Sequence, residues 1–247
     1  MGATPPLRII EKTGSTNDDA LALGRMGAAA GTAVAARRQT AGRGRRGHVW
    51  ESPVGNLYLS VVLRPETSPS RLPGLAAACG LGVLDGFREL GIANEAQLKW
   101  PNDVLAHDRK LGGILVEAAR DKRGKTFAVC GVGINLESAP HKLGGIGLTE
   151  LGSTPPFSVL AEALRGGIMA RVDAWAGADG LCPLDGIRED YLAHLAWLGE
   201  KVAALSLDGE PLASGTFETV DPWGRAVIDA ACDPRSFSAE QASLRPA

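Results

Sequence analysis

A glycine- and arginine-rich segment, residues 39–50 (QTAGRGRRGHVW), is the strongest local constraint on how this chain can fold. It is too polar and too rich in glycine to form a packed core element, so we expect it at the surface between regular elements. Glycine lets the backbone approach a ligand closely, and arginine offers a planar set of donors that fits phosphate or carboxylate. The segment is therefore predicted to wrap an anionic small molecule that carries a ring, such as a nucleotide.

The rest of the chain is long and apolar enough to form a core that supports this loop. Its 247 residues are 45% hydrophobic, which suits one medium domain or one domain with a small appendage. The formal net charge of -2 predicts no overall basic field toward nucleic acid or anionic membranes, so the arginines of residues 39–50 are a local feature. No apolar run is long enough to span a bilayer and residues 1–10 lack a signal-peptide pattern, so we expect a soluble cytoplasmic protein.

The cysteines are scattered, without a CxxC pair and without clustering with histidine. This pattern predicts reduced, mostly buried thiols rather than a zinc site or a disulfide framework. The cysteines are Cys79, Cys130, Cys182 and Cys232.

Hydrophobic patterning predicts an α/β fold with a different C-terminal part. Strands and helices are intermixed in the first part, and short strands separated by turn residues follow from residue 201. The sequence therefore predicts a first domain at residues 1–198 and a small barrel-like β domain at residues 199–247, with a loose tail after Asp233. The predicted strands cover residues 7–12, 32–38, 56–64, 98–105 (interrupted at Pro101), 110–119, 127–135, 202–207, 213–220 and 225–229. The predicted helices cover residues 15–26, 72–90, 155 or 156 to 175, and 186–195.

Local signals refine three of these elements. Ser15 and Asp18 have the spacing of a capping box at a helix N-terminus. Residues 120–124 form a polar linker with a glycine, which predicts a hairpin between the two strands that it joins. The helix at residues 72–90 contains several glycines, which lower its intrinsic propensity and would be tolerated where it packs tightly on a sheet.

Five segments place glycine, amide, hydroxyl or cationic groups at predicted strand ends and turns, where backbone can meet ligand. They are residues 15–17 (STN), 39–50 (containing GRGRRG), 99–103 (KWPND), 110–117 (KLGGILVE) and 131–136 (GVGINL). In this order and spacing the set closely resembles the bacterial biotin–protein ligases, over nearly the whole chain. Any one segment alone would be weak, but the combination is very specific.

The resemblance implies a two-step reaction. Biotin and ATP, with Mg²⁺ carried by the nucleotide, give biotinyl-AMP and pyrophosphate, and a lysine of a biotin carboxyl carrier protein then attacks the mixed anhydride. The implied fold is an α/β (α+β) catalytic domain with a central mixed sheet flanked by helices, followed by an SH3-like β-barrel. Many bacterial members also carry an N-terminal helix-turn-helix. This chain starts directly at the first catalytic strand, so we expect the ligase-only kind, without DNA or membrane binding, and with a homodimer as a possible assembly.

Adenylation brings a carboxylate onto the α-phosphate, so cations are needed to offset the repulsion. The resemblance assigns this catalytic role to Arg43, Arg45 and Lys110. Judged alone, Lys110 would be an ordinary strand-edge lysine, but the glycines that follow it favour the functional interpretation.

The resemblance also assigns the two binding sites. Ser15, Thr16 and Asn17 are expected to hydrogen-bond the ureido ring of biotin, with an ordinary helix cap as the alternative. The complete biotin set is Ser15, Thr16, Asn17, Gln39, Gly42, Arg43, Gly44, Arg45, Lys110, Gly112, Gly113 and Gly133. The adenylate set is Arg43, Arg45, Arg46, Trp50, Asn102, Lys110 and Asn135.

Three aromatic or acidic side chains and one histidine keep alternatives open. Trp50 is either the adenine platform or a core aromatic, and Trp100 is expected in the core. Asp103 could help to hold Mg²⁺, position the acceptor lysine or cap a turn, and no protein ligand to the metal is assigned. His48 stands where the family usually carries arginine or lysine, so either the loop holds the adenylate less tightly or His48 lies outside the contact shell.

Three other classes of protein share single features with this sequence. Lipoate ligases share the architecture and the acyl-adenylate chemistry, although GRGRRG and KLGGILVE favour biotin. A nucleic-acid-binding protein could also carry an Arg/Gly loop, but the near-neutral charge and the lack of interleaved aromatic residues argue against it. A P-loop enzyme is excluded because the sequence contains no GxxxxGK[ST]. The loop is expected to order over its ligand and to shield a reactive anhydride from water.

Overall fold

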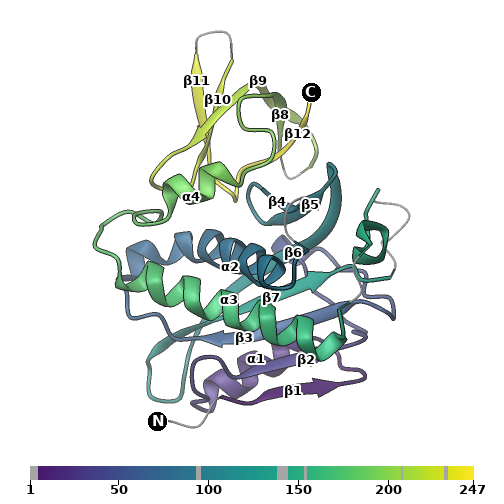
Figure 1. Ribbon diagram of the computed structural model, residues 1–247. Helices are drawn as coiled ribbons and strands as arrows, with labels where there is room; N and C mark the ends of the chain where they lie inside the picture. Colours follow the sequence, from purple (N-terminus) through teal and green to yellow (C-terminus); the bar gives the residue numbers. More distant parts are fainter. Residues whose placement is uncertain (1–4, 93–95, 138–143, 153–154, 207, 231–232) are drawn as a thin grey trace.

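The computed structural model describes residues 5–92, 96–137, 144–152, 155–206, 208–230 and 233–247. Two sheets organise these residues, a seven-stranded mixed sheet and a five-stranded antiparallel sheet (Figure 1). The predicted fold class, a mixed sheet flanked by helices with a small β unit after it, is confirmed.

The strands of the larger sheet come from residues 7–134. Its strands β1 and β2 are parallel, and every other neighbouring pair is antiparallel. Since β6 and β7 are consecutive and paired, the predicted hairpin across residues 120–124 is confirmed. In spatial order the strands are β1 (Leu7–Ile10), β2 (Ala33–Ala36), β3 (Leu57–Leu63), β7 (Thr126–Ile134), β6 (Arg109–Arg120), β5 (Asp103–Ala106) and β4 (Ala96–Lys99).

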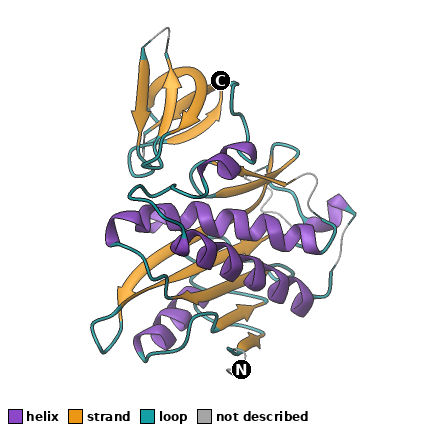
Figure 2. Ribbon diagram, turned by 60° about the vertical axis from the view of Figure 1, so that its left-hand side comes forward, coloured by secondary structure: helices purple, strands orange, loops and turns teal. Residues whose placement is uncertain are grey.

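Helices cover both faces of this sheet. The long helices α2 and α3 lie together on one face, and the shorter α1 lies on the other (Figures 1 and 2). The core follows this division, because Ala20 and Leu21 of α1 pack on Val62 and Phe127, while most other apolar side chains gather on the α2–α3 side. The helices are α1 (Thr16–Arg25), α2 (Leu75–Glu89), α3 (Phe157–Gly177) and α4 (Arg188–Ala193), and the short 3₁₀ segments are Arg45–Gly47, Pro69–Gly74 and Leu148–Leu151.

The glycines of α2 allow close packing, as expected, but mostly against another helix rather than against the sheet. A Cβ added at Gly82 would lie 2.5 Å from the Cα of Ile168, and one added at Gly86 would lie 2.8 Å from the carbonyl oxygen of Ala163. Both glycines therefore allow close packing against α3 rather than against the sheet. Gly80 alone of these three faces strands of the sheet, toward the side chains of Leu98 and Ile114.

The C-terminal sheet contains two strands that the sequence did not predict. The segment after Asp233 is not a loose tail, because it forms β11 and β12, and β12 pairs with β8. Both strands are short and mostly exposed, and Phe237 and Leu244 supply their buried apolar side chains. So few apolar positions leave a weak alternation signal. In spatial order the strands are β11 (Pro234–Phe237), β10 (Ala226–Asp229), β9 (Pro211–Val220), β8 (Lys201–Leu205) and β12 (Ser243–Pro246).

The two sheets are joined by a shared core rather than by a bare linker. The main apolar cluster runs from β3 and α2 into Val202 and Phe217 of the smaller sheet. Trp100 is 2% exposed, as expected for a core aromatic, and its Nε1 donates to the carbonyl of Gly224 at 3.0 Å. The change of sheet falls between α4 and β8, near the predicted boundary at residues 198 and 199, and the division into domains stays a prediction.

Candidate active site

Glycines on β6 and β7 form a flat floor on the α1 side of the larger sheet. Gly113 lies opposite Gly133, and Leu115 lies opposite Gly131. A Cβ added at Gly113 or at Gly133 would lie 2.9 Å from the ring of Trp50. A Cβ added at Gly131 would lie 2.0 Å from Asn17 Oδ1. The floor therefore depends on bare backbone, which lets polar and aromatic groups approach the strands closely.

Two of the glycines that the sequence assigns to ligand binding face elsewhere. Gly112 alternates with Gly113 along β6, and a Cβ added to it would meet the carbonyl oxygen of Gly133 at 2.5 Å on the opposite face. Gly42 is enclosed by Ser52 and by the backbone of Trp50. Neither is among the described residues that line the slot above the floor. Gly44 does line it, as predicted.

The N-terminus of α1 forms one wall of the slot. Ser15, Thr16 and Asn17 are all buried there. Ser15 occupies the N-cap position, but its side chain makes no capping hydrogen bond, so the expected capping box is wrong. The backbone N–H and the hydroxyl of Thr16 both donate to Gln39 Oε1, at 2.8 and 3.0 Å. The structure thus brings together the four uncharged polar residues that were predicted to meet biotin, whereas Lys110 of the same predicted set does not line the slot.

A buried network behind this wall was missed by sequence reasoning. Ser60 Oγ on β3 lies 2.8 Å from Thr16 Oγ1 and 2.6 Å from Asn17 Oδ1. Asn17 Nδ2 donates to Glu117 Oε2 at 2.7 Å. A polar side chain in an apolar strand needs a buried partner, so the serine within NLYLSVVLR was an available signal.

Tyr58 is a second residue of the slot that the sequence did not single out. It lies two positions from Ser60 on β3, on the same face, and lines the slot. Its hydroxyl donates to the carbonyl of Pro53 at 2.9 Å. Burial raises the pKa of Tyr58 to about 12, so the hydroxyl remains a neutral donor at physiological pH.

Arginines tie the glycine-rich loop to α1 and to β6. Arg43 Nη2 lies 2.8 Å from Asp18 Oδ1 and 2.7 Å from Glu117 Oε2. Arg45 Nη1 donates to Asn102 Oδ1 at 3.0 Å, and Asn102 donates in turn to the carbonyl of Ile114 at 2.9 Å. The loop is therefore held against the floor by charged and amide side chains from three separate elements.

The same loop also contacts the smaller sheet. Arg45 Nη2 donates to the carbonyl of Ala239 at 2.6 Å, and Arg46 donates to the same carbonyl. Burial lowers the pKa of Arg45, and the neighbouring Arg46 lowers it further, while Glu240 opposes the shift. The turn between β11 and β12 thus supplies carbonyl oxygens to two arginines of the loop, a contact that no sequence pattern indicated.

Lys110, Asp103 and Trp50 meet in the larger cavity beside the slot. Lys110 Nζ lies 2.6 Å from Asp103 Oδ1 and 4.9 Å from the centroid of the Trp50 ring. Burial alone would raise the pKa of Asp103, but the ammonium groups of Lys110 and Lys99 outweigh it, so the carboxyl pKa lies below its ordinary value. Asn135 supports this corner, because its Nδ2 donates to the carbonyl of Lys110 at 3.1 Å.

Trp50 separates two spaces of very different size. The slot over the glycine floor measures about 40 Å³, and the cavity beyond, toward the smaller sheet, measures about 560 Å³. Gly44, Arg45, Trp50 and Asn102 line both, and Lys110, Asp103 and Asn135 line the larger cavity. Trp50 is therefore a residue of the site rather than a plain core aromatic, and its role as adenine platform stays a prediction.

Among the described residues, no group of three or more His, Cys, Asp or Glu side chains is placed to hold a metal ion. Cys79 and Cys130 are free and buried, and Cys182 is free and half-buried. Cys232 lies outside the described residues. No helix in the described part of the chain is long and apolar enough to cross a membrane.

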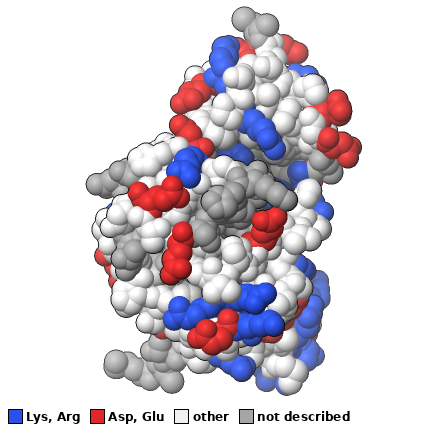
Figure 3. Space-filling model, turned by 90° about the vertical axis from the view of Figure 1, so that its right-hand side faces the viewer, with Lys and Arg blue, Asp and Glu red and all other residues white. Residues whose placement is uncertain are grey.

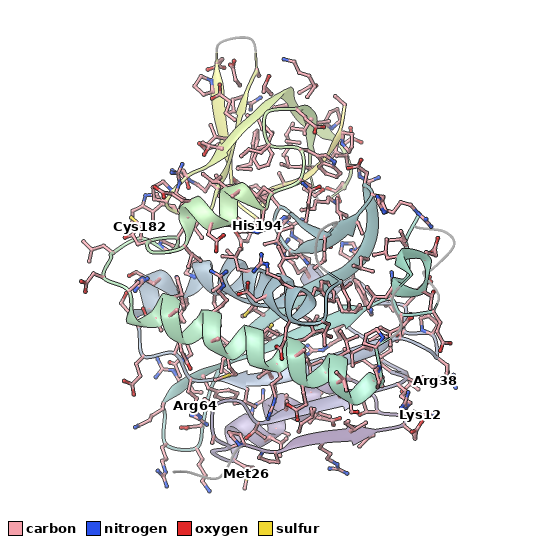
Figure 4. The ribbon with its side chains drawn as sticks, in the orientation of Figure 1. Lys12, Met26, Arg38, Arg64, Cys182 and His194 are labelled. Carbon is pink, nitrogen blue, oxygen red and sulfur yellow. The ribbon has the colours of Figure 1, made fainter. Side chains whose placement is uncertain are left out.

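The distribution of surface charge bears on the nucleic-acid alternative. On the face shown in Figure 3, basic side chains form separate groups with acidic side chains among them. Lys12 and Arg38, labelled in Figure 4, extend from the ends of neighbouring strands, and the adjacent Arg37 lies 3.4 Å from Glu11. This face therefore lacks the continuous basic surface typical of nucleic-acid binding.

His48 lies at the rim of the larger cavity, and its backbone carbonyl accepts from Gly44 N at 2.7 Å. Because its side chain is exposed, we expect His48→Arg to leave adenylation within about twofold of the original rate, as is usual for a surface substitution. The measurement is the rate of biotinyl-AMP formation in both proteins. A loss of adenylation in the folded variant would show that His48 has a specific role.

The fold and the site define an α/β enzyme in which a small polar slot adjoins a larger cavity with cations at the junction. The chain matches the family described as "Biotin/lipoate A/B protein ligase family" over residues 10–135. It belongs to this family.

Within this family, the chain is similar to proteins and solved structures that are named as biotin ligases. The chain is 36% identical over 244 residues to the biotin–[acetyl-CoA-carboxylase] ligase of Paracoccus denitrificans, covering 90% of this chain and 98% of that protein. It is 36% identical over 231 residues to the Mycobacterium tuberculosis protein of the same name, covering 90% of this chain and 83% of that protein. The biotin protein ligase of Aquifex aeolicus in complex with biotin and ATP superposes with a TM-score of 0.81 at 26% identity, covering 98% of this chain and 99% of that one.

Proposed function

We propose that this protein is a biotin–[biotin carboxyl carrier protein] ligase. It activates biotin with ATP to biotinyl-5′-AMP and transfers the biotinyl group to a lysine of a carrier protein. Similarity to a named biotin–[acetyl-CoA-carboxylase] ligase over 98% of that relative supports this activity. The single observation that carries the proposal is structural: cations gather where the slot and the larger cavity meet, which is where a carboxylate and a phosphate would have to react.

The polar wall of the slot suits the ureido ring of biotin. The ureido ring needs both donors and acceptors, and the wall offers hydroxyls from Ser15 and Thr16 together with the amides of Asn17 and Gln39. The apolar thiophane ring and valeryl chain would lie in the slot against the apolar surfaces of Trp50, Tyr58 and Leu115, which line it. The valeryl carboxylate would then point toward Lys110 and Arg45.

The larger cavity suits ATP. Trp50 presents a flat face for adenine, and Arg46, Asn102 and Asn135 stand around the space for the nucleotide. Two carboxylates line this cavity: Asp103 is already paired with Lys110 and Lys99, and Glu51 is exposed. The described residues thus present cations rather than a carboxylate cluster to the phosphates, so Mg²⁺ would be held mainly through phosphate oxygens and water.

The chemistry follows from this placement. In the first step a biotin carboxylate oxygen attacks the α-phosphorus, the bond from that phosphorus to the bridging oxygen breaks, and pyrophosphate leaves. Lys110, Arg45 and Arg43 offset the negative charge that gathers on the reacting groups. In the second step the amine of the acceptor lysine attacks the acyl carbon, AMP leaves with the electrons of the broken bond, and the amine loses a proton. Asp103 is a candidate contact for that incoming lysine.

Arg45 has a separate role in retaining the intermediate. It reaches both Asn102 and the carbonyl of Ala239, so it fastens the loop across the site. We expect Arg45→Gly to release biotinyl-AMP about tenfold faster, because a charge-assisted contact of about 1.5–3 kcal/mol is lost. The measurement is labelling of bystander lysines in a mixture that also contains the carrier.

The matched control for that experiment is Arg123→Gly, in the exposed turn between β6 and β7. This variant should label bystander proteins no more than the original protein does. If Arg45→Gly also labels only the carrier, the proposed retention role is wrong.

The proposed activity is tested by mass spectrometry of a carrier domain incubated with this protein, biotin and MgATP. We expect one lysine to gain a biotinyl group, and an unmodified carrier under active conditions would refute the proposal. Isothermal titration with biotin and with lipoate separates the two substrates that the family description covers. Three further points stay predictions. The carrier experiment itself checks carrier binding, a gel shift checks the absence of DNA binding, and a solution mass measurement checks homodimer formation.

A further inference from the structure

Asp103 lies between two lysines, each of which also faces a tryptophan. On one side Lys110 Nζ contacts Asp103 Oδ1 at 2.6 Å and faces the ring of Trp50. On the other side Lys99 Nζ contacts Asp103 Oδ2 at 3.2 Å and lies 5.6 Å from the ring centroid of Trp197. The Asp103 side chain is 15% exposed, so both contacts are largely shielded from water.

The two lysines differ in their access to substrate. Lys110 and Asp103 line the larger cavity, whereas Lys99 is not among the described residues that line it. Lys99 ends β4 and pairs across the β4–β5 hairpin with Asp103. A substrate anion in the cavity can therefore reach Lys110 directly, while Lys99 contacts Asp103 from behind.

Lys99 is held from the junction of the two sheets. Trp197 Nε1 donates to Asp108 Oδ1 at 2.9 Å, which fixes the ring beside the lysine. The segment that carries Trp197 runs beside β4, since Leu98 N donates to the carbonyl of His194 and Ala196 N donates to the carbonyl of Leu98, both at 2.8 Å. Figure 4 shows His194 at the base of the smaller sheet, so this support comes from outside the cavity.

The arrangement matters when Lys110 acts. To stabilise the reacting carboxylate and phosphate, Lys110 must turn from Asp103 toward the substrates. A buried carboxylate that loses its counter-charge is costly. With Lys99 in place, Asp103 keeps one ammonium partner throughout. Arg45 is the other cation that acts on Asp103, and it is already held by Asn102 and Ala239.

We propose that Lys99 is a positioning residue for adenylation, which holds Asp103 so that Lys110 can leave it for the substrate anions. This inference rests on the proposed function. Lys99 touches no substrate and acts only through Asp103. Its loss should therefore affect the rate of the chemical step and leave the biotin slot unchanged.

The test uses Lys99→Met, which removes the charge and keeps an unbranched apolar stem beside Trp197. We expect biotinyl-AMP formation at saturating substrates to slow about tenfold, with the biotin Kd changed less than about twofold. Because Asp103 loses a cation, its pKa should rise. As the pH is lowered, the variant should therefore lose activity at a higher pH than the original protein does. Lys99→Arg should restore most of the rate, and Lys125→Met is the matched surface control.

A double-mutant cycle separates positioning from general damage. In the Asp103→Asn background there is no carboxylate to hold, so Lys99→Met should change the rate less than about twofold. The inference is overturned if Lys99→Met is as active as the original protein, or if its loss is equally large beside Asp103→Asn. If the original protein itself forms no biotinyl-AMP, the proposed function fails instead.

Discussion

Replacing Lys110 by methionine is expected to slow biotinyl-AMP formation by about 10²–10³-fold, the usual cost of removing one preorganised charge-stabilising group. Lys110 lines the larger cavity and faces Trp50, which separates that cavity from the slot, and its Nζ lies 2.6 Å from Asp103 Oδ1. Methionine keeps the length and the apolar stem but cannot offset the charge on the reacting carboxylate and phosphate. The measurement is single-turnover formation of biotinyl-AMP.

The stability of this variant should change little, which makes the kinetic result interpretable. Asp103 retains its contact with Lys99, so the substitution leaves no unpaired buried carboxylate. Lys122→Met, in the exposed turn between β6 and β7, is the matched control and should keep the original rate. A rate within about threefold of the original, in a Lys110→Met protein with the original Tm, would remove Lys110 from the catalytic role, since it corresponds to less than 1 kcal/mol.

Residues within contiguous motifs could be placed in the site from the sequence. Thr16, Asn17 and Lys110 lie in short segments whose glycines, amides and charges already indicate ligand contact. Their position at strand ends and at a helix start follows from local patterning, which the structure bears out. Local chemistry and local structure agree there, so little tertiary information was needed.

The supporting network could not be predicted in the same way. Asn17 and Glu117 are 100 positions apart and bond directly, and Ser60 contacts Asn17 from the middle of an apolar strand. No motif spans such a distance, and only the pairing of β3, β7 and β6 brings these side chains onto one face. The contact of Arg45 and Arg46 with the turn between β11 and β12 is of the same kind.

The two glycines of KLGGILVE show a different limit. Successive residues of a strand point to opposite faces, so only one of Gly112 and Gly113 can belong to the floor. The sequence gives their alternation but not the phase, because both faces of this sheet are covered by helices. In the structure Gly113 belongs to the floor and lies under Trp50, whereas Gly112 faces the other side of the sheet.

Gly131→Ala is expected to weaken biotin binding by about 10²-fold, or roughly 2.7 kcal/mol, and to lower stability by about 1–3 kcal/mol. Its Cβ would lie 2.0 Å from Asn17 Oδ1, so the Asn17 side chain must move. That movement would break the contacts of Asn17 with Ser60 and Glu117, and Glu117 also holds Arg43. Isothermal titration with biotin and thermal unfolding measure the two effects.

Gly166→Ala is the matched control for Gly131→Ala. Gly166 lies within α3, and a Cβ added there meets no atom within 4 Å. Alanine is a better helix former than glycine by about 1 kcal/mol, so this variant should bind biotin normally and unfold at an equal or higher temperature. Wild-type biotin affinity in Gly131→Ala would show that Asn17 can move without loss. The polar wall at the start of α1 would then not be what recognises the ureido ring.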